Sequence, residues 1–153
     1  MSIRDRLISD LKSAMKSGKR DRVSVLRMVR AKIVEAQVNL RVKKGLDYEL
    51  SDTETVEVII GYAKQQRQSI ESYRQVDRED LVKKEAAELA IIQEYLPRQL
   101  SEDEVARFAT EAITEAGAST LKDLGVVMKI LMPRIHGVAD GKVVNKIVRN
   151  LLS

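Results

Sequence analysis

The sequence contains no cysteine and no tryptophan, and it has only one histidine, one phenylalanine and two prolines among 153 residues. The absence of cysteine excludes disulfide bonds and thiolate metal sites, and it fits a protein of a reducing compartment. Aromatic residues make up 3% of the chain, whereas 44% of the residues are hydrophobic. We therefore predict one aliphatic core, or two small ones, with little aromatic packing.

Long apolar runs are also missing, because no run approaches the ~20 residues that are needed to cross a bilayer. The first residues, MSIRDRLISDLK, lack the basic segment and the unbroken apolar core of a signal peptide. Asp5 and Asp10 argue against a transit peptide, in which acidic residues are rare. We expect a soluble, cytoplasmic protein that does not associate with membranes.

Charge is distributed unevenly along the chain. Residues 1–44 carry 13 Lys or Arg against 4 Asp or Glu (+9), residues 45–116 carry 8 against 17 (−9), and residues 117–153 carry 6 against 2 (+4). If the two basic ends share one side of the molecule, they form a surface that attracts polyanions. If they pack on the acidic middle, the asymmetry reflects internal pairing. The sequence leaves both arrangements open.

Apolar residues recur at helical spacing along the chain, and no stretch shows sustained strand alternation, so the sequence predicts an all-α protein. Capping boxes begin at Ser51 and Ser101, and Asp77 is the expected cap of a helix between them. Pro97 should end that helix. Because a helix stop and a strong helix start lie so close together, we predict a domain boundary there. We expect an N-terminal bundle of about four helices in residues 1–97 and a small three-helix domain in residues 98–153.

The last helix separates apolar from basic residues most clearly. Pro133 is expected to break the preceding helix, and a loop with Gly137 and Gly141 follows. In the last helix the expected buried side carries Val143, Val144, Ile147, Val148 and Leu151. The opposite side carries Lys142, Lys146 and Arg149 at i, i+4, i+7, a spacing that could follow a phosphate backbone. A basic side that only faces solvent is the alternative interpretation.

A second candidate nucleic-acid surface lies in the predicted helix over residues 20–44. Arg27, Arg30 and Arg41 return to nearly the same angle on a helix of about 3.6 residues per turn. Arginine suits bidentate phosphate contacts. The alternative is that these arginines pair with the carboxylates of the acidic helices that follow.

Few residues could carry catalysis, because Glu85 and Glu88 lie one turn apart but His136, the only histidine, is far from them along the chain. We interpret that pair as exposed neighbours on one helix, and His136 as a contact to backbone or solvent or, alternatively, to a phosphate or base. Residues 137–142 are too short for a Walker motif, and Asp140 is the expected helix cap. The sequence predicts no catalytic residues, no metal and no cofactor.

Several short segments of the chain form a combination that is more specific than each segment alone. They are Arg22-Val23-Ser24-Val25-Leu26-Arg27, the run from Tyr62 to Leu100 that ends in Tyr95-Leu96-Pro97-Arg98-Gln99-Leu100, Gly117-Ala118-Ser119, Asp123-Leu124-Gly125, Leu131-Met132-Pro133 and Ala139-Asp140-Gly141-Lys142-Val143-Val144-Asn145. Together they resemble the YqeY-like (GatB/YqeY) family, and the likeness covers nearly the whole chain. The C-terminal three-helix part is similar to the tail domain of the B subunit of the glutamine-dependent tRNA amidotransferase. In that enzyme the tail is implied to recognise tRNA, while amide transfer belongs to other domains.

The resemblance therefore implies a non-catalytic tRNA-binding or tRNA-associated module. Lys142, Lys146 and Arg149 would contact phosphates, with Arg134 and His136 at the neighbouring loop. The alternative is a helical protein–protein adaptor that docks on an aminoacyl-tRNA or amidotransferase complex. A carbon–nitrogen ligase with glutamine as amido donor ranks last, because these residues supply no set of nucleophile, base and oxyanion donor.

Overall fold

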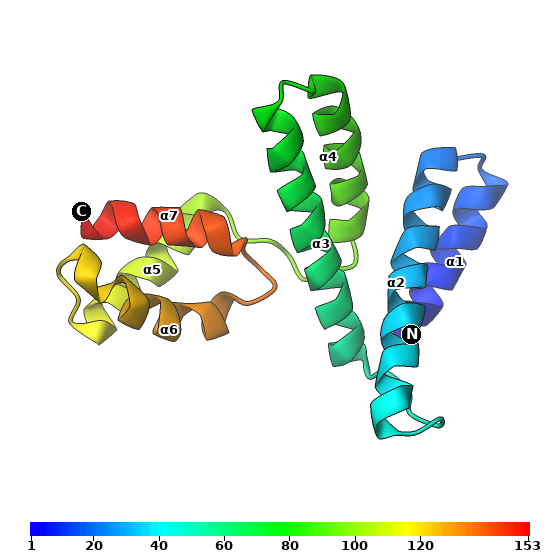
Figure 1. The fold of residues 1–153 in the computed structure, drawn as a ribbon, viewed down its shortest axis with the longest axis horizontal. Helices are drawn as coiled ribbons and strands as arrows, with labels where there is room; N and C mark the ends of the chain where they lie inside the picture. Colours follow the sequence, from blue (N-terminus) through cyan, green and yellow to red (C-terminus); the bar gives the residue numbers. More distant parts are fainter. The chain divides into compact units, whose positions relative to one another are not determined.

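A computed structural model describes all residues, 1–153, and it contains seven α-helices, one short 3-10 helix and no strand (Figure 1). The prediction of an all-α fold is thus confirmed. The elements in chain order are α1 (Ile3–Lys16), α2 (Arg20–Lys44), α3 (Asp52–Gln75), α4 (Glu79–Gln93), α5 (Glu102–Ala116), η1 (Leu121–Asp123), α6 (Leu124–Ile135) and α7 (Gly141–Leu152).

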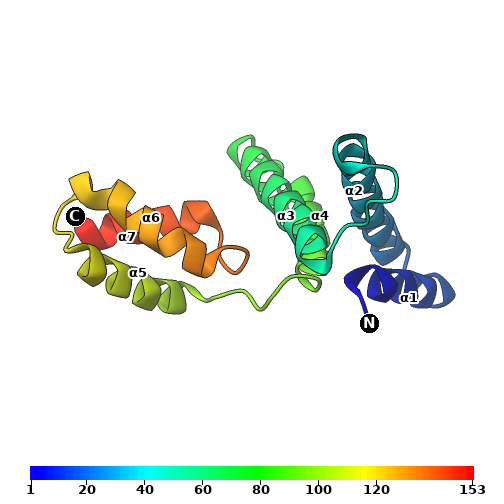
Figure 2. The same cartoon turned by 90° about the horizontal axis from the view of Figure 1, so that it is seen from below.

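The chain forms two compact units, Met1–Leu96 and Pro97–Ser153. In the N-terminal unit α1 packs along the first half of α2, α3 packs along α4, and α2 contacts both α3 and α4 (Figures 1 and 2). Gly18 takes a φ of 68° in the turn between α1 and α2, a left-handed conformation that glycine adopts without strain. The core is aliphatic apart from Tyr95 and contains Leu7, Leu11, Val25, Leu26, Val29, Ile33, Leu50, Ile59, Ala63 and Ile92.

Polar contacts hold the end of α4 against α1 and α2. The Tyr95 hydroxyl donates a hydrogen bond to Asp10, and the guanidinium of Arg6 lies 4.5 Å from the centre of the Tyr95 ring. Arg22 donates two hydrogen bonds, of 2.7 and 3.2 Å, to the Glu94 carboxylate. Burial, and then the bond to Asp10, raises the pKa of the Tyr95 hydroxyl. These contacts join residues that lie 72 to 89 positions apart in the sequence.

The C-terminal unit packs α5 against both α6 and α7, and α6 against α7. Its core contains only aliphatic residues: Val105, Ala109, Ala112, Val127, Leu131, Ile135, Val144, Val148 and Leu152. The capping boxes predicted at Ser51 and Ser101 are both present. Gly117 ends α5 in the left-handed conformation, with a φ of 64°.

Three expected helix boundaries are wrong. α6 continues through Pro133 to Ile135, so the proline, which lacks the N–H for a helical hydrogen bond, lies in the last turn and the helix ends two residues after it. Arg78 rather than Asp77 is the N-cap of α4, and Asp77 takes a φ of 55° in the turn before it. α4 itself ends at Gln93, several residues before Pro97.

We predict that Tyr95→Phe lowers the free energy of unfolding by about 1–2 kcal/mol, because it removes a hydrogen bond to a charged acceptor. Tyr73→Phe is the matched control, since no hydrogen bond of the Tyr73 hydroxyl is present, and it should change stability by less than about 0.5 kcal/mol. Urea unfolding followed by circular dichroism measures both. Equal stabilities for the two variants would show that the contact with Asp10 contributes nothing.

Candidate nucleic-acid interface

The orientation of α7 is set by its buried side. Val144, Val148 and Leu152 repeat every four residues and enter the core of the C-terminal unit. The expectation that Leu151 is buried is wrong, since it is 47% exposed. Leu152 is buried instead, because it lies four residues after Val148 on the same side of the helix. Val143 and Ile147 are half-buried at the edge of the same side.

The three cations of α7 are exposed to solvent. Lys142, Lys146 and Arg149 lie outside the buried side, and none of them forms an ion pair within the chain. Arg149 donates a hydrogen bond of 2.8 Å to the Asn145 side chain on the same helix. No aspartate or glutamate occurs in α7, so the positive charge of this surface is not neutralised locally. We call Lys142, Lys146 and Arg149 the basic face of α7.

The loop before α7 is held in place by hydrogen bonds from Gln99 and Leu100, which lie just before α5. The side-chain amide of Gln99 donates a hydrogen bond of 2.9 Å to the Gly137 carbonyl, and the Leu100 amide donates one of 2.7 Å to the Val138 carbonyl. Asp140 is the N-cap of α7, as predicted, and its carboxylate accepts from the Lys142 amide at 3.4 Å. Because that carboxylate occupies the helix start, a phosphate would be repelled there. The basic face, rather than the helix N-terminus, is therefore the candidate anion contact.

Arg134 and His136 lie at the end of α6, in the same unit as the basic face. Arg134 forms a 2.5 Å ion pair with Glu115 of α5, although both side chains are largely exposed. His136 is the C-cap residue of α6 and is exposed. Arg134 thus differs from the cations of α7, since a phosphate would have to displace a carboxylate to reach it.

In the second predicted surface, the structure gives Arg41 a different environment from Arg27 and Arg30. Arg27 and Arg30 of α2 are exposed and form no ion pair within the chain. Arg41 is half-buried and donates to the Tyr48 carbonyl at 3.0 Å and to Glu49 at 3.1 Å. The pairing expected as the alternative thus holds for Arg41, although its partner lies in the loop before α3 rather than in an acidic helix.

Glu85 and Glu88 are half-buried, so the expectation of an exposed pair is wrong. Gln66 of α3 is only 6% exposed, and its amide nitrogen donates to both carboxylates, at 3.0 Å for Glu88. Burial, and then the charges of these two carboxylates, raises the pKa of the Tyr62 hydroxyl. No signal in the sequence points to this role of Gln66, because its partners come from another helix. No group of histidines and carboxylates in the structure is arranged to hold a metal ion.

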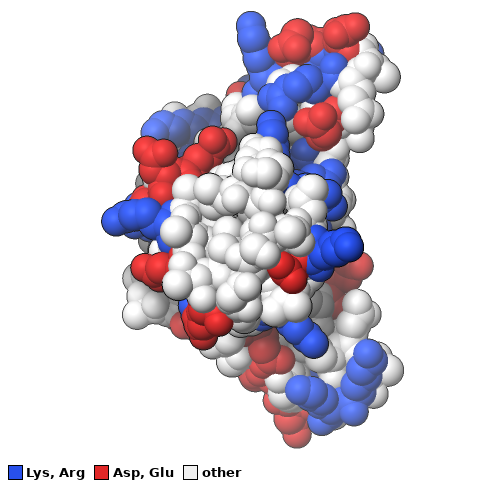
Figure 3. Space-filling model, turned by 90° about the vertical axis from the view of Figure 1, so that its left-hand side faces the viewer, with Lys and Arg blue, Asp and Glu red and all other residues white.

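The surface charge of the C-terminal unit is not uniform. Figure 3 faces the end of this unit at which α7 finishes, and that end is mostly uncharged, with both basic and acidic side chains at its margins. The charged side chains therefore lie along the sides of the unit. A polyanion attracted to the cations of α7 would contact the side of that helix rather than its tip.

A family model described as Yqey-like protein matches residues 4–152, so the chain belongs to the YqeY-like family. The chain is also 31% identical over 153 residues to a protein of Pyrenophora tritici-repentis (strain Pt-1C-BFP) named altered inheritance of mitochondria protein 41, mitochondrial. This similarity covers 96% of the chain and 79% of the relative. None of the helices has the length and apolar content that a membrane crossing requires.

The segment before α5 gives a pH-dependent prediction. Arg98 donates two hydrogen bonds to Glu104, at 3.0 and 2.7 Å, and the Ser101 amide donates a third at 3.2 Å. These bonds, first that of Arg98 and then that of Ser101, lower the pKa of Glu104 from 4.5 to about 2. Because this pKa is lower in the folded chain, the stabilisation is complete above the unfolded value and is lost as the pH falls from about 4.5 towards 2.

We expect Arg98→Ala to raise the pKa of Glu104 towards its ordinary value and to move the acid unfolding of the C-terminal unit to higher pH. Carboxyl chemical shifts measured by NMR across pH report the first effect, and circular dichroism reports the second. Arg107→Ala is the control, since Arg107 is exposed on α5 and forms no ion pair. An unchanged Glu104 titration in Arg98→Ala would contradict the assignment of the shift to Arg98.

Proposed function

We propose that this protein is a non-catalytic tRNA-binding module and that it holds RNA through the basic face of α7. One observation carries the proposal: three exposed cations, free of carboxylate partners, lie on a helix whose other side is fixed in a core. Cations at such positions replace counterions condensed on a nucleic acid, and their release drives association. Membership of the YqeY-like family is consistent with this function but does not define it.

The spacing of the basic face suits a backbone contact. Lys146 and Arg149 lie about 6 and 10 Å along the helix axis from Lys142, at about 1.5 Å per residue. Long, flexible side chains at these intervals reach successive phosphates without reading the bases, so the contact positions the RNA but does not select a sequence. Selection would therefore depend on the shape of a folded RNA, which suits tRNA.

Arg134 and His136 supply the edge of the proposed interface. An exposed ion pair contributes only about 0–1 kcal/mol, so a phosphate can replace Glu115 at Arg134 at small cost. His136 offers a ring that can stack on an unpaired base or donate to a phosphate. The proposal does not include Arg27, Arg30 and Arg41, because they lie on α2 in the N-terminal unit and Arg41 is engaged by the loop before α3.

In this proposal the two compact units are separate domains, residues 1–97 and 98–153, and the second is the RNA-binding one. The proposal does not depend on the compartment, because tRNA is present both in the cytoplasm and in mitochondria.

We expect the double variant Lys146→Glu/Arg149→Glu to bind tRNA about tenfold or more weakly at low salt. It should also reduce the slope of log affinity against log salt by about one for each lost contact, because fewer counterions are released. Electrophoretic mobility or fluorescence titrations at several salt concentrations measure both quantities.

Lys83→Glu/Lys84→Glu is the matched control, since both lysines are exposed on α4 in the acidic middle of the chain. It changes the net charge equally but lies outside the proposed interface, so the salt slope should stay close to that of the parental protein. Equal losses of tRNA affinity in the two double variants would show that the effect comes from net charge alone. A parental protein without affinity for tRNA at low salt would refute the proposed function.

A further inference from the structure

Helix α2 is apolar on two opposite sides. One side carries Val25, Val29 and Ile33 into the core of the N-terminal unit. The other side carries Met28, Val34, Val38 and Val42, whose side chains are between 48% and 84% exposed. At about 100° per residue these four fall within an arc of roughly 120°, centred opposite the buried side. We call them the apolar stripe of α2.

Single exposed hydrophobic residues are ordinary, but a continuous stripe on one helix marks an interaction surface. α1 covers only the first half of α2, and the second half extends beyond it (Figure 1). The stripe therefore remains open over most of its length. No other helix of the N-terminal unit closes over this side, since the apolar residues on it remain exposed in the folded chain.

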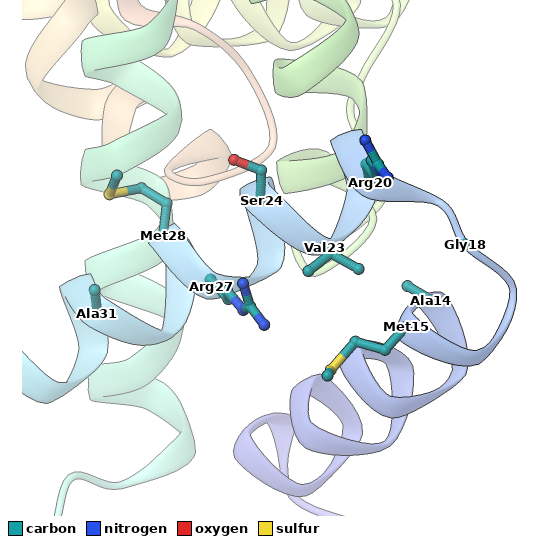
Figure 4. A pocket seen from close by; sticks show the side chains of 9 residues that line it. All are labelled: Ala14, Met15, Gly18, Arg20, Val23, Ser24, Arg27, Met28 and Ala31. Carbon is teal, nitrogen blue, oxygen red and sulfur yellow. The ribbon is translucent and has the colours of Figure 1, made fainter.

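A groove of about 610 Å³ between α1 and α2 adjoins the start of the stripe. Figure 4 shows Val23 and Arg27 of α2 and Met15 of α1 directed into the space between the two helices, with Met28 on the adjoining side of α2. The remaining lining residues are mostly small, so the groove is open enough to admit a side chain from outside. Methionines suit such a surface, because their flexible side chains adapt to different apolar partners.

The charged residues that line the groove are all basic. Arg20 and Arg27 are its only charged lining residues, and neither forms an ion pair within the chain. Arg30 is exposed nearby on α2, whereas α2 carries two exposed carboxylates at the margins of this side, Asp21 and Glu35. An apolar floor with cationic edges complements a ligand with an apolar side and acidic edges.

The apolar stripe, the groove and its arginines together indicate which kind of ligand this surface binds. A phosphate backbone gains nothing from the methionines and valines, which it would have to dehydrate. A second copy of the chain would bring the basic residues of one α2 against those of the other, and residues 1–44 carry a net charge of +9. An amphipathic helix, by contrast, presents apolar residues at i, i+3, i+4 and i+7, which match a straight stripe and a groove.

We propose that the α1–α2 groove and the apolar stripe of α2 bind an acidic amphipathic helix of a partner protein. Apolar side chains of that helix enter the groove beside Met15 and Met28 and continue along Val34, Val38 and Val42. Its carboxylates meet Arg20 and Arg27. This surface lies in the N-terminal unit, and the proposal does not depend on RNA binding by α7.

The test uses the full-length protein and a fluorescein-labelled peptide of about 18 residues, which spans the stripe at about 1.5 Å per residue. The peptide carries leucine at i, i+3, i+4 and i+7 and glutamate on its flanks, and a second peptide carries lysine in place of each glutamate. Fluorescence polarisation should show saturable binding of the acidic peptide and at least tenfold weaker binding of the basic one.

Three variants locate the site. Met28→Glu and Met15→Glu should each weaken binding of the acidic peptide about tenfold, because a carboxylate enters the apolar floor. Arg27→Glu should weaken the acidic peptide and strengthen the basic one. Val126→Glu is the control, since Val126 is comparably exposed but lies on α6, and it should bind both peptides as the parental protein does. Circular dichroism confirms that each variant remains helical.

The proposal is overturned if the acidic peptide does not saturate, or if both peptides bind equally, because binding would then be absent or merely apolar. Sedimentation that shows a dimer lost in Met28→Glu would assign the surface to a second copy and would also overturn it. A loss of tRNA affinity in Met28→Glu would assign the surface to RNA instead. Unchanged tRNA affinity in that variant, together with lost peptide binding, supports the proposal and leaves the function of α7 to its own test.

Discussion

The burial of Val144, Val148 and Leu152 is the constraint on which the functional interpretation depends. Each buried aliphatic side chain contributes about 1.5–3 kcal/mol, whereas an exposed ion pair contributes about 0–1 kcal/mol. The core therefore sets the rotation of α7, and the surface charges follow from it. Once the three aliphatic residues are inside, helical geometry places Lys142, Lys146 and Arg149 outside. The basic face is thus a consequence of packing, and it does not require attraction to any neighbouring carboxylate.

The acidic middle of the chain serves the fold in several places. Glu54 and Glu104 complete the two capping boxes, and Glu94 binds Arg22. Glu49 binds both Arg4 and Arg41. The uneven charge of the sequence is therefore explained in part by internal pairing near α1 and α2. The cations of α7, and Arg20, Arg27 and Arg30 on α2, remain outside this network, and they are the residues that carry the two proposals.

Local signals predicted the fold well, because helix caps and apolar periodicity involve residues only three or four positions apart. The capping boxes at Ser51 and Ser101 and the N-cap at Asp140 are examples. Predictions that depended on distant residues were less successful. Neither the burial of Glu85 and Glu88 beside Gln66 nor the ion pair of Arg134 with Glu115 follows from helical spacing, because each partner lies on another helix. The groove beside Met15 and Met28 likewise exists only once α1 folds back on α2.

The most direct test of the central claim is to follow the backbone amide signals of the full-length protein by NMR while tRNA is added. If the basic face of α7 holds RNA, the signals of Lys142, Lys146 and Arg149 and of the loop at His136 shift or broaden first, and they recover when salt is raised. Changes confined to other helices, with α7 unaffected at a tRNA concentration that saturates binding, would contradict the account.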